Sequence, residues 1–194
     1  MRMQARFTTA LGLPVVEERH GETVGHITGM LLHPDTGTVE GFYVSAPAMF
    51  GTQEFFCAAQ DIIRWGAFLA VRSAEALSLA EEHIRLQPLL EDGRTILGQH
   101  IRTQSGVHVG ICRDVQFSTE SMKLTWLFPK RWWRWGTAIP VSEIIEVLPD
   151  AVVVRDPIAY EKESIADVGR EALEKLQEIT DPGIARPSRS LKRR

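Results

Sequence analysis

Cysteine is scarce in this sequence, which contains only Cys57 and Cys112 among 194 residues. Two thiols in a chain of this length exclude a framework of several disulfide bonds. Both lie beside apolar residues in segments that have the pattern of strands. We therefore expect two buried, unreactive thiols rather than a reactive pair.

Long apolar runs are also missing. No segment approaches the roughly 18 consecutive apolar residues that a membrane-spanning helix requires. Residues 11–16 form too short and too broken a run to be the apolar part of a signal peptide. These absences favour a cytoplasmic protein, and they leave open a role at a membrane surface.

Motifs that carry catalysis are lacking as well. No serine lies in a G-x-S-x-G setting, and no glycine-rich loop ends in Lys-Ser or Lys-Thr. The six histidines show no metal-ligand spacing, so chance or surface placement explains them. Without a set of nucleophile, base and orienting group, we expect no enzyme activity, no cofactor and no metal.

Charge is unevenly distributed along the chain. The formal net charge is −3, from 22 basic and 25 acidic residues. Five basic residues lie at the end with no acid among them, and without them 17 basic residues face 25 acids, a net charge of −8. They are Arg186, Arg189, Lys192, Arg193 and Arg194. An acidic body argues against a broad face for duplex nucleic acid, which needs positive charge spread over the contact.

The sequence repeats itself at an offset of about 85 residues, a period that indicates duplicated structural units. Recurring pairs are Leu11-Gly12 with Leu97-Gly98, Gly21 with Gly106, Val24-Gly25 with Val109-Gly110, and Asp61-Ile62-Ile63 with Glu143-Ile144-Ile145. Each copy alternates short β-forming segments with turns such as His33 to Gly37. Short strands at this spacing favour a small barrel, because closure removes exposed sheet edges.

Five segments follow from this pattern. They are a first repeat at 8–77, a polar linker at 78–93, a second repeat at 94–157, a helical segment at 158–181 and a disordered basic tail at 182–194. The helix is predicted from Ser164 to Thr180, where a capping box precedes an apolar stripe that includes Ile165, Val168 and Leu176. The stripe would pack on a barrel, on a partner or on a second copy of the chain.

The order of these motifs resembles the PRC-barrel family. The first copy carries Leu11-Gly12, Gly21 to Gly25, Pro34 to Gly37 and Ala59 to Ile62, and the second carries Leu97-Gly98, Gly106 to Gly110 and Ile139 to Ile144. Ala59 replaces the usual proline, and residues 118–121 replace the proline-containing turn. The resemblance implies an all-β fold of two tandem PRC-like barrels, followed by the C-terminal helix and the tail.

This family includes the cytoplasmic part of a photosynthetic reaction-centre subunit, a domain of a ribosome-maturation factor and proteins similar to cell-division adaptors. The resemblance implies docking to a larger protein assembly without catalysis, and no catalytic residues carry over. Two alternatives stay open at this point. One is an RNA- or ribosome-associated maturation factor, and the other is a peripheral membrane adaptor.

One segment, 123–135, holds four of the five tryptophans and no acid. Trp126 aligns with Gly41 on a strand, so we expect it in the core or between the copies. The candidate partner-binding residues lie in the hairpin that follows a turn at Pro129: Lys130, Arg131, Trp132, Trp133, Arg134 and Trp135. Tryptophan beside basic residues suits an anionic membrane surface, a protein hot spot or stacked nucleic-acid bases. Alternatively, the rings fold back onto the barrels.

Overall fold

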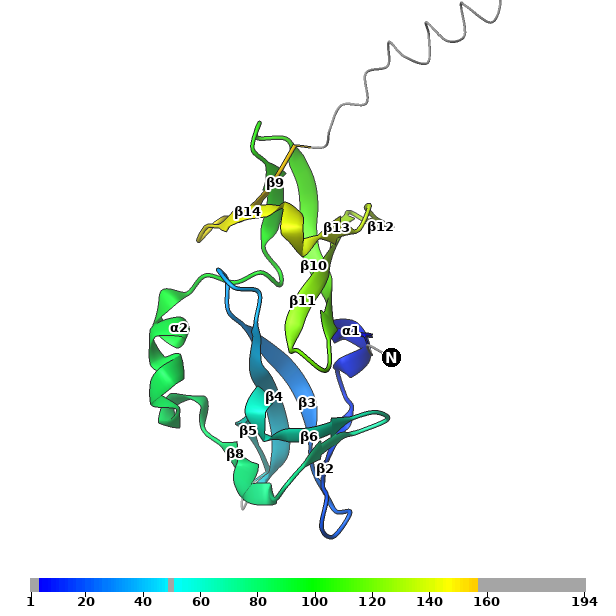
Figure 1. Ribbon diagram of the computed structural model, residues 1–194, viewed down its shortest axis with the longest axis vertical. Coiled ribbons are helices and arrows are strands. Elements are labelled where there is room, and N and C mark those ends of the chain that lie inside the picture. The colour runs from blue at the N-terminus through cyan, green and yellow to red at the C-terminus, as the bar shows by residue number, and fades with distance from the viewer. Residues whose placement is uncertain (1–3, 49–50, 157–194) are drawn as a thin grey trace, which may run out of the picture. The chain divides into compact units, whose positions relative to one another are not determined.

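The computed structural model describes residues 4–48 and 51–156, and this part of the chain is mostly β-structure in two curled sheets (Figure 1). The prediction of a predominantly β chain is therefore confirmed. Helical segments in the described part are short. They are α1 (Phe7–Ala10), α2 (Gln87–Asp92) and the 3₁₀ turns η1 (Ala59–Asp61), η2 (Ala74–Ala76), η3 (Ala80–Glu82), η4 (Ile84–Leu86) and η5 (Val141–Glu143).

The first sheet has seven strands in the order β6-β7-β2-β3-β4-β5-β8. They are β2 (Pro14–Glu17), β3 (Thr23–Leu32), β4 (Val39–Ala48), β5 (Gly51–Ala58), β6 (Ile62–Trp65), β7 (Leu69–Val71) and β8 (Leu77–Ser78). Strand β2 pairs antiparallel with β3 and parallel with β7. The chain therefore returns to its first strand after forming the β3–β4–β5 meander.

The second sheet has eight strands, of which six follow the order β12-β11-β10-β9-β15-β14. Its strands are β1 (Gln4–Arg6), β9 (His100–Thr103), β10 (His108–Ser118), β11 (Lys123–Arg131), β12 (Arg134–Trp135), β13 (Ile139–Pro140), β14 (Ile144–Val147) and β15 (Ala151–Val154). Strand β9 pairs antiparallel with β10 and parallel with β15. This order matches that of β6-β7-β2-β3-β4-β5 in the first sheet.

A left-handed glycine precedes the first strand of each meander. Gly12 has φ +79° and Gly98 has φ +81°, a region that glycine enters without steric cost. The N–H of Gly12 donates to the carbonyl of Ile27 at 2.8 Å, and the N–H of Gly98 donates to that of Cys112 at 2.7 Å. The recurring Leu-Gly pair therefore makes the same backbone turn at both places.

The two sheets contribute to one hydrophobic core. Phe42 of β4 and Phe117 of β10 are fully buried, and their ring centroids lie 5.8 Å apart. Trp65 of β6 contacts both rings, with centroid distances of 5.2 Å to Phe42 and 5.4 Å to Phe117. A core shared in this way buries more apolar surface than either small sheet would bury alone.

Backbone hydrogen bonds also join the ends of the β3–β4 and β10–β11 hairpins. The N–H of Val39 donates to the carbonyl of Met122 at 2.8 Å, and the N–H of Leu124 donates to that of Gly37 at 2.9 Å. Gly37 and Met122 both have positive φ, +63° and +49°. The two hydrogen bonds are reciprocal and join corresponding positions of the two hairpins, as a local twofold relation would produce.

The segment expected to be a polar linker, 78–93, is folded against the first sheet. Ala80 and Leu86 from this segment form a buried cluster with Phe56, and Tyr43 packs against it. These strand residues alternate with core residues, so they lie on the opposite face of the sheet. The segment therefore covers one face of the first sheet as well as connecting the two halves.

Trp126, which the sequence placed in the core or between the copies, is not in the core. Its side chain is 39% exposed on β11, where it is paired with Gln116 on one side and Pro140 on the other. The predicted helix at 158–181 and the predicted tail at 182–194 lie outside the described residues. Within the described part of the chain, no helix is long and apolar enough to span a bilayer.

Candidate docking surface

The tryptophan segment forms a tight β-hairpin. Strand β11 continues through Pro129 to Arg131, beyond the turn that the sequence predicted at this proline. Arg131 pairs with Arg134 of β12, so Trp132 and Trp133 are the two residues of the turn. Pro129 has no N–H to donate, and it is tolerated because it lies at a bulge, where the β10–β11 register shifts between Cys112 and Asp114. Its carbonyl accepts a hydrogen bond from Gly136 N–H at 2.9 Å.

The rings at the hairpin tip are exposed, which is one of the two arrangements that the sequence left open. Trp132 is 81% exposed, Trp133 is 75% exposed and Trp135 is 53% exposed. The rings of Trp132 and Trp133 stand edge to face, with centroids 5.9 Å apart and an interplanar angle of 81°. Aromatic rings gain most when they are buried, so three rings left in water mark a surface that a partner could cover.

Two further features of the tip are locally unfavourable. Trp132 has φ +58°, in a two-residue turn whose first position normally favours glycine or asparagine. Arg131 and Arg134 lie directly opposite one another, and like charges in that arrangement repel. Strain and repulsion that combine at one exposed site indicate selection for binding rather than for stability.

The base of the hairpin is held by a residue from the start of the chain. The Arg6 guanidinium lies 4.0 Å from the centroid of the Phe128 ring and 5.7 Å from that of Trp135. Lys130 Nζ lies 5.4 Å from the same Trp135 ring. Sequence reasoning missed Arg6, because no local pattern predicts that β1 pairs with β10.

Arg6 is itself anchored to a buried carboxylate. Arg6 Nε lies 2.7 Å from Asp114 Oδ2, and Asp114 is fully buried. Thr8 donates to the same carboxylate from its backbone N at 3.0 Å and from Oγ1 at 2.8 Å. Asp114 therefore fixes both β1 and the guanidinium that contacts the hairpin rings.

The surface around the hairpin carries basic charge and exposed aromatic area together. Trp126, Phe128 and Lys130 alternate along β11 and so share one face of the sheet, which leads to the tip. The sequence has no acidic residue between Glu120 and Glu143. We call this surface, made of Arg6, Trp126, Phe128 and the six residues 130–135, the tryptophan hairpin surface.

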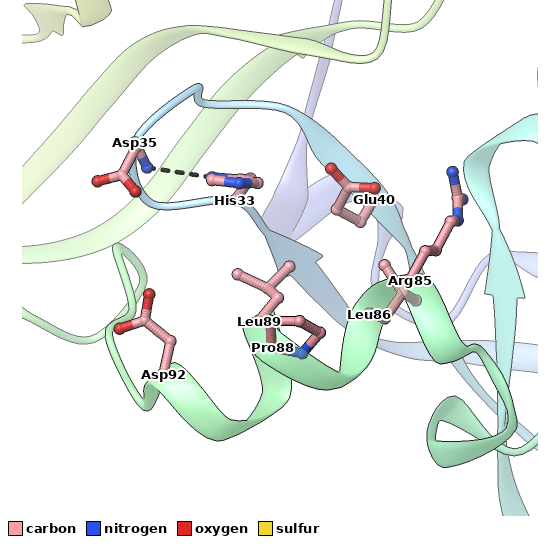
Figure 2. A pocket seen from close by; sticks show the side chains of 8 residues that line it. All are labelled: His33, Asp35, Glu40, Arg85, Leu86, Pro88, Leu89 and Asp92. Carbon is pink, nitrogen blue, oxygen red and sulfur yellow. Dashed lines mark hydrogen bonds between the residues drawn. The ribbon is translucent and has the colours of Figure 1, made fainter.

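A hollow of about 250 Å³ lies between the β3–β4 turn and α2 (Figure 2). Its lining residues are His33, Asp35, Glu40, Arg85, Leu86, Pro88, Leu89 and Asp92. The backbone N of Asp35 donates to His33 Nδ1 at 3.3 Å, as the dashed line in Figure 2 marks. The ring nitrogen that faces the turn is thus already an acceptor for the protein's own backbone.

Arg94 forms hydrogen bonds with both aspartates of this hollow. It donates to Asp35 at 2.7 and 2.9 Å and to Asp92 at 2.7 and 2.6 Å. These hydrogen bonds lower the pKa of both carboxyls below their ordinary value of 3.8. Arg94 also donates to the carbonyl of Val147 in β14 at 3.1 Å. At this hollow, Arg94 therefore links the first sheet, α2 and the second sheet.

The two cysteines are fully buried, and burial raises the pKa of each thiol to about 12. His100 and His108, which the sequence did not connect, lie with their rings 5.4 Å apart. Among residues 4–48 and 51–156, no three histidine, cysteine or acidic side chains are arranged to hold a metal ion. The tryptophan hairpin surface is the stronger candidate for function.

Neither a scan of protein-family models nor a search of curated proteins finds a match to this sequence.

Proposed function

We propose that this protein is a non-catalytic docking module that binds a larger assembly through the tryptophan hairpin surface. The proposal includes the interpretation of the two sheets as tandem PRC-like barrels. The observation that carries it is the hairpin tip, where three exposed tryptophans lie beside three basic residues. Tryptophan and arginine are the residues that most often dominate binding energy at protein contacts.

The internal correspondence of the two sheets supports the tandem interpretation. Both have the same strand order, and in both the strand after the Leu-Gly turn pairs parallel with a later strand, β2 with β7 and β9 with β15. The hydrogen bonds of Gly12 and Gly98 also correspond. The two copies differ at this hairpin, because only the second carries tryptophan at its tip.

An RNA-binding role has less support. A sequence-independent RNA contact needs positive charge that follows the nucleic-acid backbone over several nucleotides. Here the basic side chains of the surface lie at one tip, and the chain without its last five basic residues has a net charge of −8. A compact contact with the tip suits this distribution better.

The proposal is tested by capture from a native lysate with full-length protein. The variant is Trp132→Ser, Trp133→Ser, Trp135→Ser, and it should lose the material that the wild-type chain retains. The control replaces two other exposed apolar residues, Ile84→Ser and Val107→Ser, which are 81% and 61% exposed. Equal circular dichroism spectra and melting temperatures would show that all three proteins are folded.

Three outcomes would contradict the proposal. If the triple tryptophan variant is folded and captures the same material as the wild-type chain, the hairpin is not the docking surface. If the triple variant unfolds, the three rings contribute to the core rather than to a contact. Loss of capture by the Ile84 and Val107 control would place the contact elsewhere on the molecule.

A further inference from the structure

We infer that the surface to which the tryptophan hairpin docks is an anionic lipid bilayer. This inference rests on the proposed function and names its partner. It places the hairpin tip at the lipid headgroups, with the two turn tryptophans entering the interface. The rest of the protein then stays in water.

The placement of the rings fits a bilayer interface. Trp132 and Trp133 form the turn itself, so they reach a flat surface before any other part of the hairpin. Tryptophan is enriched where membranes meet water, because its ring is apolar and its N–H can still find a polar partner. The bilayer would thereby cover the rings that are 81% and 75% exposed.

The placement of the charges fits an anionic surface. Arg131 and Arg134 flank the turn as an opposed pair, and Lys130 lies one residue behind them. Anionic headgroups between the two guanidinium groups would replace repulsion by attraction. Each basic residue near such a surface increases binding roughly five-fold, so three of them supply about a hundred-fold.

The charge of the rest of the chain fixes the orientation. Without the five terminal basic residues the net charge is −8, although the hairpin itself is purely basic. An anionic bilayer therefore repels most of the molecule and attracts the tip. Such a distribution favours docking by the hairpin end and disfavours flat adsorption of a sheet.

The ring geometry favours lipid over nucleic acid. Bases bind aromatic side chains by stacking on an open ring face. Trp132 and Trp133 stand edge to face at 81°, so one ring covers a face of the other, and the two do not offer parallel faces to successive stacked bases. A fluid array of headgroups and acyl chains has no such geometric requirement, and it accommodates rings in any orientation.

The test is flotation of the full-length protein with vesicles. Phosphatidylcholine vesicles are compared with vesicles that also contain phosphatidylglycerol. We expect binding only to the anionic vesicles, a blue shift of tryptophan emission on binding, and weaker binding at high salt because salt screens the attraction. Equal binding to both kinds of vesicle, or none to either, would overturn the inference.

Three variants separate the contributions to binding. Trp132→Ser, Trp133→Ser, Trp135→Ser should abolish the blue shift and flotation, and Lys130→Gln, Arg131→Gln, Arg134→Gln should weaken binding about a hundred-fold. A third variant changes the basic residues 186–194 to glutamine and should still float in a tryptophan-dependent way. If only this tail variant loses binding, the hairpin is not the lipid contact and the inference is wrong.

Failure of this inference is distinguishable from failure of the proposed function. If the wild-type chain ignores anionic vesicles but retains a protein complex from detergent-cleared lysate through the tryptophans, docking stands and the lipid partner is wrong. A tryptophan-dependent mobility shift with single-stranded RNA, without vesicle binding, would likewise reject the bilayer. If the triple tryptophan variant matches the wild-type chain in every assay, both proposals are wrong.

Discussion

Asp114 accepts hydrogen bonds from both the backbone N and the hydroxyl of Thr8, although the two residues are 106 positions apart. The carboxylate is fully buried and also meets the Arg6 guanidinium. Removing one partner of a buried charged network leaves the others without compensation. One side chain in the second half of the chain thus holds Arg6 and Thr8 in place.

Replacing Asp114 with alanine should therefore lower the free energy of unfolding by about 3 kcal/mol. The matched control is Asp150→Ala, because the Asp150 side chain is 71% exposed and its nearest cation, Arg102, is 3.8 Å away. That change should cost less than about 0.5 kcal/mol. Urea denaturation measures both values, and equal costs would contradict the assigned role of Asp114.

Stability should depend on pH through Arg94. The pKa values of Asp35 and Asp92 are lowered in the folded state, so their contribution is present above the ordinary value of 3.8. It is lost as the pH falls through the lower folded values. The melting temperature of Arg94→Gln should lie below that of the wild-type chain at neutral pH, and the gap should narrow below pH 3.8.

Arg102→Gln provides the comparison for this experiment, because among residues 4–48 and 51–156 the Arg102 side chain makes only the exposed contact with Asp150, at 3.8 Å. Its melting temperature should stay close to that of the wild-type chain at neutral pH. A constant gap between Arg94→Gln and the wild-type chain across the acid range would show that the aspartates do not mediate the effect.

Trp132→Gly should separate stability from docking. Trp132 has φ +58° and is 81% exposed, so glycine relieves backbone strain and removes little packing. We expect an unchanged or higher melting temperature together with weaker docking. Trp133→Gly is the control, since positive φ is found at Trp132 and not at its neighbour. A clear loss of stability in Trp132→Gly alone would contradict the assignment of strain.

The thiols of Cys57 and Cys112 should resist modification in the native protein. Burial raises the pKa of each to about 12, so the reactive thiolate is scarce at pH 8. A thiol reagent should label neither residue until urea unfolds the chain, and then label both. Rapid labelling of the folded protein would show that one of them is accessible.

The sequence predicted those parts of the fold that depend on local pattern. The recurrence of the Leu-Gly pair, the β-rich character and the hairpin that contains Trp132 and Trp133 all follow from short-range signals. Pairing of β1 with β10 has no such signal, because it joins residues more than 100 positions apart. Arg6 was for that reason missing from the predicted surface.

Trp126 shows why alignment of the repeats was not enough to predict which side chains are buried. It corresponds to Gly41, where an added Cβ would lie 2.4 Å from the Phe56 ring. That ring belongs to the cluster covered by residues 78–93. On β11 the neighbouring position is Pro140, and Trp126 stays 39% exposed. Burial at equivalent positions therefore depends on the segment that packs over them, which the alignment does not include.

The position of β1 has a consequence for how the protein is made. Residues 4–6 are synthesised long before their partner strand, which runs from His108 to Ser118. Until more than a hundred further residues have been synthesised, β1 has no strand edge to join. It can pair only after β10 has been made. Two chains that emerge close together could exchange these segments, so crowded synthesis would favour intertwined pairs over single molecules.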